Sequence, residues 1–282
     1  MEFITLSDEK RHKFEETGYL IVHNVLNPET IAELVAAGDR IFAENPEQKR
    51  QQKAQGVWDS YRNCLALDDA FIPLLTQPRI LSYIIQLLGP NLHMMTSHLI
   101  YRFPDPSGTP SSFRPFGWHR DIAHMAEDLG YRATPRLMIK CAFYLTDLIE
   151  QDCGATLVLP GSNHLKTEPV IPSDQSDPDG TVEPHLAAGD CLLFENRTWH
   201  AVGANLHGLT RKTVMFGYGF RWLKPVDYVT QTSELVEKLS LFGKFLVGER
   251  LQSSRKFQIG GSVNPLKEWA EEHNFFYHPP SN

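Results

Sequence analysis

The chain has 282 residues, of which 41% are hydrophobic and 22% charged, and its formal net charge is −7. This balance is typical of a folded protein with a sizeable core, whereas the acidic charge argues against nucleic acid, which is bound by Lys and Arg that neutralise phosphates. Four scattered cysteines without a CxxC pair, together with the lack of a signal-peptide pattern or a long apolar run, predict a cytoplasmic protein with no membrane partner.

The chain up to about residue 90 is expected to be mainly helical. Ser7 has the position of an N-cap for a helix over residues 8–17, and the apolar run 19–26 that follows predicts a strand. Apolar residues at helical spacing predict two more helices, over residues 28–45 and 76–88.

Short apolar runs separated by turn residues replace the helical pattern after this point. They predict strands over residues 93–103, 136–148, 154–160, 190–196 and 212–222. Consecutive strands without helices between them indicate an antiparallel sandwich or barrel. We therefore expect a mainly β core over about 90–222, a helical extension over about 223–282 whose clearest helix is 233–252, and one domain overall.

The triplet His119-Arg120-Asp121 is a candidate metal motif. Chance alone would produce such a triplet in a chain with this many histidines and acidic residues, so its context decides. Side chains two apart on a strand share a face, and His200 would complete the two-histidine, one-carboxylate set that holds iron(II) with open positions. The plain alternative for His200 is a structural histidine packed beside Trp199.

Arg211 begins the last predicted strand, eleven residues after His200. Counting by twos places Thr213, Gly217 and Gly219 on the same face as Arg211, and glycine in a strand leaves room where a ligand approaches. Arginine grips a carboxylate with two parallel hydrogen bonds. Metal ligands and a carboxylate clamp in one cavity fit a 2-oxo acid, which would chelate iron through its 1-carboxylate and keto oxygen and reach Arg211 with its far carboxylate.

These segments together resemble the phytanoyl-CoA dioxygenase family of iron(II)- and 2-oxoglutarate-dependent oxygenases, over about residues 9–222. GWHRD is similar to the family's Trp-His-x-Asp motif, DCGATLVLPGSNH to its glycine-containing signature, and AAGDCLLFENRTWHAVGAN to the segment of the distal histidine. The chain departs from the family at Asp152-Cys153 and at Asn163, which are not metal ligands in the family. The resemblance implies a double-stranded β-helix, or jelly-roll, core.

The resemblance also implies the cofactors and their contacts. His119, Asp121 and His200 would hold iron(II), and 2-oxoglutarate and O2 would be cosubstrates, with ascorbate stimulating turnover. Residues of the cosubstrate pocket would be Arg211, Thr213, Arg102, Thr156 and His98. For Arg102 and Thr156, a surface arginine and a plain packed threonine are the alternatives.

Hydroxylation of a small secondary metabolite or lipid-like molecule is the activity that the resemblance favours. Desaturation, epoxidation and ring closure at the same centre stay open, whereas halogenases of this type replace the carboxylate of Asp121 with Gly or Ala. A non-catalytic jelly-roll binding protein would be expected to lack an iron ligand or Arg211, and all four are present. Basic residues between 114 and 140 leave an anionic substrate open, beside the alternative of a solvated loop: Arg114, Arg120, Arg132, Arg136 and Lys140. The sequence does not predict an oligomeric state.

Overall fold

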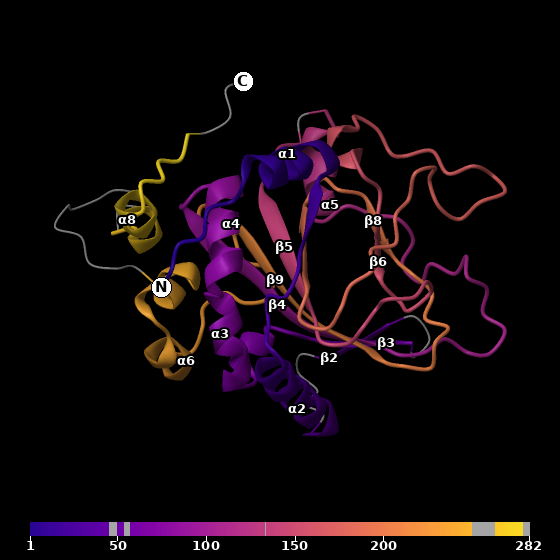
Figure 1. Ribbon diagram of the computed structural model, residues 1–282, viewed down its shortest axis with the longest axis horizontal. Helices are drawn as coiled ribbons and strands as arrows, with labels where there is room; N and C mark the ends of the chain where they lie inside the picture. Colours follow the sequence, from indigo (N-terminus) through magenta and orange to yellow (C-terminus); the bar gives the residue numbers. More distant parts are fainter. Residues whose placement is uncertain (45–49, 54–56, 133, 250–262, 279–282) are drawn as a thin grey trace.

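The computed structural model describes residues 1–44, 50–53, 57–132, 134–249 and 263–278, and a large antiparallel sheet lies at its centre (Figure 1). Within those residues the large sheet has seven strands in the order β1-β7-β5-β9-β4-β3-β2. Its strands are β1 Tyr19–Val22, β2 Arg50–Lys53, β3 Trp58–Arg62, β4 Leu92–Arg102, β5 Met138–Tyr144, β7 Cys191–Glu195 and β9 Arg211–Phe220.

A second, smaller sheet pairs β6 (Thr156–Val158) with β8 (His200–Val202). Side chains of both sheets share one buried cluster, which includes Tyr144 and Met215 of the large sheet and Val158 of the small one. The predicted mainly β fold with a jelly-roll core is therefore confirmed.

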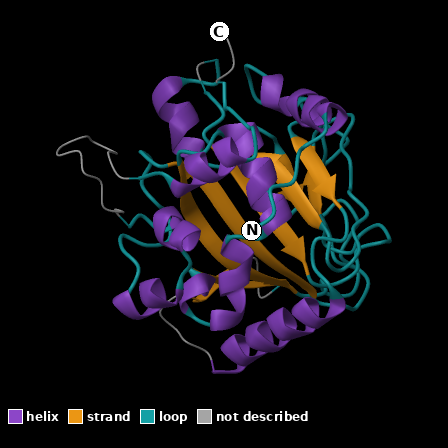
Figure 2. Cartoon of the chain, turned by 60° about the vertical axis from the view of Figure 1, so that its left-hand side comes forward, coloured by secondary structure: helices purple, strands orange, loops and turns teal. Residues whose placement is uncertain are grey.

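Helices cover the opposite face of the large sheet, as Figures 1 and 2 show. The helices are α1 Asp8–Thr17, α2 Pro28–Glu44, α3 Ile72–Leu75, α4 Pro78–Leu88, α5 Ala123–Leu129, α6 Ser233–Lys238, α7 Leu241–Leu246 and α8 Pro265–Glu272, with 3-10 turns at Cys64–Ala66, Asp69–Phe71 and Ser162–His164. The alternation on β9 explains the layers. Val214, Phe216 and Tyr218 pack under the helices in the main core, while Arg211 and Met215 line the cavity on the other face.

The ends of α1 follow the predicted signals. The Ser7 hydroxyl accepts a hydrogen bond from the amide of Lys10 at 3.3 Å, and Gly18 ends the helix in the left-handed conformation, with φ 80°. The helix expected over 233–252 is divided into α6 and α7 because Ser240 caps the second helix, accepting from the amide of Gly243. Residues 250–252 of that prediction lie outside the described residues.

The large sheet begins earlier in the chain than the predicted core. Strands β1, β2 and β3 precede residue 90 and form its two edges, and β3 pairs with β4 over Trp58–Arg62. In the described part of the chain no single helix is long and apolar enough to cross a membrane, and only the bent pair Asp69–Leu75 and Pro78–Leu88 passes on length and composition.

Candidate metal centre

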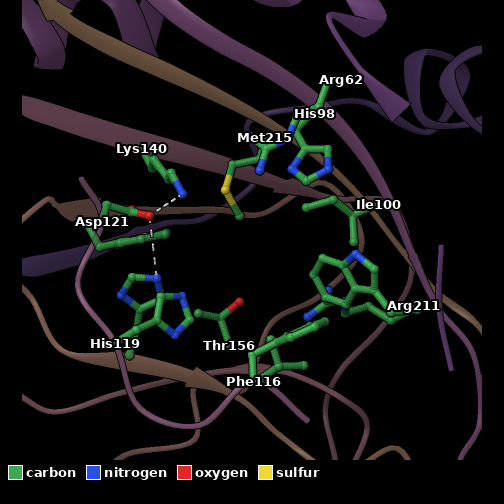
Figure 3. Close-up of a pocket in the computed structure, with 14 residues that line it drawn as sticks. Arg62, His98, Ile100, Phe116, His119, Asp121, Lys140, Thr156, Arg211 and Met215 are labelled. Atoms are coloured by element: carbon green, nitrogen blue, oxygen red, sulfur yellow. Dashed lines mark hydrogen bonds and ion pairs between the residues drawn. The ribbon is translucent and has the colours of Figure 1, made fainter. Parts of the chain in front are cut away.

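His119, Asp121 and His200 meet in a cavity between the two sheets (Figure 3). Each offers one ligand atom, and these atoms all lie within 4.8 Å of one another. His119 and His200 are bridge partners from separate segments, and their ring centroids are 4.3 Å apart. The three side chains could therefore hold a metal ion, as the sequence predicted.

The backbone of this motif differs from a regular strand. The bridge stops at His119, and Asp121 lies in a bend that leads into α5. Ile122, directly after the carboxylate, has φ 56°, a strained conformation for a β-branched side chain. Such strain clusters at functional sites, where the surrounding structure enforces it.

Hydrogen bonds to backbone carbonyls fix the orientation of both imidazoles. His200 Nδ1 lies 2.9 Å from the carbonyl oxygen of Thr198, and His119 Nδ1 lies 3.2 Å from that of Gly117. A carbonyl oxygen can only accept, so each Nδ1 carries the proton and donates it. The Nε2 atoms are left with a lone pair, as metal-binding histidines require.

The protonation states also suit a metal. Burial, with the nearby His119, lowers the pKa of His200 to about 3. Burial alone would raise the pKa of Asp121, but the charge of Lys140 and the neighbouring His200 outweigh it and lower that pKa to about 2. At neutral pH the site therefore offers a carboxylate and a neutral His200.

One carboxylate oxygen of Asp121 has no protein partner. Oδ1 accepts a hydrogen bond from Lys140 Nζ at 2.5 Å, whereas Oδ2 is buried without a hydrogen bond. A buried, unsatisfied carboxylate oxygen is costly unless something binds it. With two imidazoles facing it, the donor set fits iron(II).

Arg211 is a buried cation without a carboxylate partner among the described residues. Its side chain is 2% exposed, its Nη1 donates to the carbonyl oxygen of Gly154 at 2.6 Å, and its guanidinium lies 5.4 Å from the centre of the Trp58 ring. Arg211 Nε and Thr213 Oγ1 are both buried without a hydrogen bond. Burial lowers the pKa of Arg211 to about 10, so it is still charged at neutral pH. These unused donors fit a carboxylate ligand.

The cavity has a volume of about 390 Å³, within the range of about 300–1,000 Å³ typical of small-molecule sites. Its wall is partly apolar, with Ile100, Phe116, Phe194, Val202 and Met215. Of the expected cosubstrate contacts, His98, Thr156 and Arg211 line it. The Thr156 hydroxyl accepts a hydrogen bond from the Tyr144 hydroxyl at 2.9 Å.

The structure does not bring Arg102 to this cavity. Its side chain is fully buried and forms an ion pair with Asp105 at 2.5 Å. It also donates to the carbonyl oxygen of Phe103, and a Cβ on Gly154 would lie 3.0 Å from its Cγ. Arg102 is the cross-strand partner of Arg211, and it packs against Gly154, whose carbonyl oxygen Arg211 contacts.

The expected space at Gly217 and Gly219 is filled by neighbouring strands, so that prediction is wrong. A Cβ on Gly217 would lie 2.7 Å from Thr96 Cγ2, and one on Gly219 would lie 2.8 Å from Met95 Cγ. These glycines allow close approach of a strand, not of a ligand.

The cavity or near-cavity residues that were not predicted as site residues include Lys140, Tyr144, Trp58 and Arg62. Lys140 appeared only as part of a basic stretch, and Tyr144 lies on the same face of β5, four residues later. That alternation is a signal that could have found both. Trp58 and Arg62 come from β3, a strand that the sequence did not predict.

Comparison with known proteins adds a family and relatives. The family model described as phytanoyl-CoA dioxygenase matches residues 14–213. The peroxisomal phytanoyl-CoA dioxygenase of Rattus norvegicus is 27% identical over 243 residues, which cover 76% of this chain and 68% of the rat protein.

Solved structures share the fold. The epimerase SnoN, in complex with Fe3+, alpha ketoglutarate and nogalamycin RO, is 22% identical with a TM-score of 0.58, over 75% of this chain and 82% of SnoN. HygX from Streptomyces hygroscopicus, with nickel, 2-oxoglutarate and hygromycin B bound, is 18% identical with a TM-score of 0.61, over 82% of this chain and 94% of HygX.

Proposed function

Because the chain belongs to the phytanoyl-CoA dioxygenase family and is a non-haem iron(II)- and 2-oxoglutarate-dependent dioxygenase, we propose that it hydroxylates a small molecule. One observation carries the proposal. The His119, Asp121 and His200 group and the unpaired Arg211 cation open into the same cavity of about 390 Å³, which is where a metal and the far end of a dicarboxylate would have to be held together.

The residues have separate roles. His119, Asp121 and His200 would hold iron(II). Arg211 and Thr213 bind the far carboxylate of 2-oxoglutarate, and Thr156 lines the same cavity. Iron(II) bound here supplies the activation of O2 that is coupled to the oxidative decarboxylation of 2-oxoglutarate.

Hydroxylation is favoured over halogenation by Asp121. Asp121 would be a ligand of the iron, and halogenases of this type have Gly or Ala in place of that carboxylate. The apolar wall of Ile100, Phe116 and Phe194 suits the carbon skeleton of a small secondary metabolite or lipid-like substrate. HygX and SnoN, which share the fold, have hygromycin B and nogalamycin RO bound. All four cysteines are free thiols, which suits the reducing cytoplasm in which we place the enzyme.

Isotope labelling tests the reaction type. The protein would be incubated with iron(II), ascorbate, 2-oxoglutarate and candidate metabolites under 18O-labelled O2, and the products would be analysed by mass spectrometry. We expect a product heavier by one labelled oxygen and one succinate per product molecule, with no product from Asp121→Ala. A product two hydrogens lighter without added oxygen would replace hydroxylation by desaturation, and a chlorinated product would contradict the role given to Asp121.

A further inference from the structure

Five basic residues between 114 and 140 suggested an anionic substrate, and the fold places them in different surroundings. Arg114 forms a paired contact with Asp177, through Nε at 2.7 Å and Nη2 at 2.5 Å. Arg120 donates to two backbone carbonyls, and its guanidinium lies 5.4 Å and 5.3 Å from the centres of the Trp199 and Tyr131 rings. Arg136 pairs with Glu15 and Glu195, and Arg132 is exposed. Lys140 alone of these five lines the cavity.

Lys140 lies on β5 beside the metal ligands. Its Nζ is 2.5 Å from Asp121 Oδ1 and its chain passes the Phe194 ring, with Nζ 5.9 Å from the ring centre. The side chain is 15% exposed, so its ammonium group is largely removed from bulk water. Figure 3 shows it on the opposite side of the cavity from Arg211.

The strand positions of Lys140 and Arg211 agree with this separation. Lys140 pairs across the sheet with Gly217 of β9, and Arg211 begins that strand six residues earlier. At about 3.3 Å per residue, roughly 20 Å of strand separates the backbone positions from which the two side chains reach into the cavity. The far carboxylate of 2-oxoglutarate, bound at Arg211, therefore leaves Lys140, whose protein partner is Asp121, able to pair with a second anion.

Without a further anion, the charges in a cavity that holds iron(II) and 2-oxoglutarate do not sum to zero. Iron(II) and the 2-oxoglutarate dianion cancel each other. Among the described lining residues, Arg62 is offset by Asp227, whose Oδ1 lies 3.7 Å away. Asp121 then offsets only one of the two remaining cations, Lys140 and Arg211. One positive charge is left in a partly apolar cavity, where an uncompensated charge is costly.

We infer that the substrate carries a single anionic group, a carboxylate, which binds to Lys140. This inference rests on the proposed function, because the charge balance assumes iron(II) and 2-oxoglutarate. The carbon skeleton of the substrate then lies between Phe116, Phe194 and Met215, close to the metal ligands, and its carboxylate both completes the charge balance and orients the molecule.

Three probes with the same apolar body test the charge preference: 3-phenylpropanoate, 3-phenylpropanamide and 3-phenylpropan-1-amine. Their binding to the Zn(II)- and 2-oxoglutarate-loaded full chain would be measured by ligand-observed NMR, with the 2-oxoglutarate signals followed in the same spectra. We expect the acid to bind and the amide and amine to bind at least tenfold more weakly, since a hydrogen bond to a charged group contributes about 1.5–3 kcal/mol.

Variants assign the preference to Lys140. Lys140→Met should weaken binding of the acid about tenfold or more, and Lys140→Arg should retain most of it. Because Lys140 also donates to the metal ligand Asp121, the variants would be compared at Zn(II) and 2-oxoglutarate concentrations that saturate each protein. Lys212→Met is the matched control, because Lys212 also pairs with an aspartate, Asp39, at 2.6 Å but does not line the cavity, and it should bind the acid as the wild type does.

Each other outcome is decisive. The inference is overturned if none of the probes binds, if the amide or amine binds as well as the acid, or if Lys140→Met retains the acid. It is also overturned if the acid displaces 2-oxoglutarate, or if Lys140→Met loses 2-oxoglutarate instead. A wild-type protein that binds neither Zn(II) nor 2-oxoglutarate would refute the proposed function itself, which separates the two failures.

Discussion

Replacing Arg211 by Met should weaken the binding of 2-oxoglutarate strongly while it leaves the free energy of unfolding nearly unchanged. In the wild type Arg211 is 2% exposed, and in the described structure its guanidinium donates to the carbonyl oxygen of Gly154 and pairs with no carboxylate. Burial lowers its pKa to about 10, and since each pKa unit corresponds to about 1.36 kcal/mol, the buried charge costs roughly 3 kcal/mol of folding free energy. Because the native pKa lies below the unfolded one, that cost is complete at every pH below about 10.

The substitution removes this cost but leaves the carbonyl oxygen of Gly154, which Arg211 contacts at 2.6 Å, without a donor. An unsatisfied buried carbonyl costs about 1–3 kcal/mol, so the two effects nearly cancel. We expect the free energy of unfolding of the metal-free Arg211→Met protein to stay within about 2 kcal/mol of the wild type. Affinity for 2-oxoglutarate should fall strongly, because losing the partner of a buried carboxylate costs about 2–5 kcal/mol, which is about 30-fold to a few thousand-fold.

Urea unfolding of the metal-free proteins and calorimetric titration of 2-oxoglutarate into the Zn(II)-loaded proteins measure the two quantities. Arg211→Lys should recover only part of the affinity, because a point charge does not reproduce the paired hydrogen bonds of the guanidinium. Arg132→Met, which removes an exposed arginine, is the control and should change neither quantity. Equal 2-oxoglutarate affinity in the wild type, Arg211→Met and Arg211→Lys would refute the reasoning.

Other substitutions test the metal centre, a buried histidine and the sheet. His200→Ala should lose iron(II) affinity and turnover while its circular dichroism stays native, and unchanged iron affinity would contradict the assignment. Burial lowers the pKa of His93 to about 4. As the pH falls below 6.5, the unfolded chain takes up a proton at this histidine and the folded chain does not, so the free energy of unfolding decreases. Between pH 7 and 4.5 the wild type should therefore lose about 2–3 kcal/mol more unfolding free energy than His93→Gln, and equal losses would refute this. Gly217→Ala should cost about 1–3 kcal/mol of unfolding free energy, because its Cβ would lie 2.7 Å from Thr96 Cγ2. Adding Thr96→Ser, which removes that methyl, should recover most of the loss in urea unfolding, and no recovery would argue against the clash.

The sequence was sufficient to predict those site residues that stand in recognisable local motifs. The His119 and Asp121 motif, His200 and Arg211 each stand in a segment with a recognisable pattern, and the structure brings all four to one cavity. Alternation along β9 also predicted its two faces, because the period of two is a property of the strand itself. The bulky face packs under the helices, and Arg211 faces the cavity.

Only the tertiary structure showed that Lys140 lines the cavity and that Arg102 does not. Alternation gives the face of a strand but not the partner that a side chain meets there, which depends on the register between strands. The guanidinium of Arg102 pairs with Asp105 and donates to the carbonyl oxygen of Phe103, whereas Lys140 donates to Asp121.

The glycines of β9 and the unpredicted strand β3 show the same limit. Gly217 had the pattern of a ligand-contact position, but its register opposite Thr96 fills the space with a neighbouring side chain. Trp58 and Arg62 reach the cavity because β3 pairs with β4, a contact between segments far apart in the chain. The sequence therefore determined which residues could carry the chemistry, and the pairing of distant strands determined which of them meet.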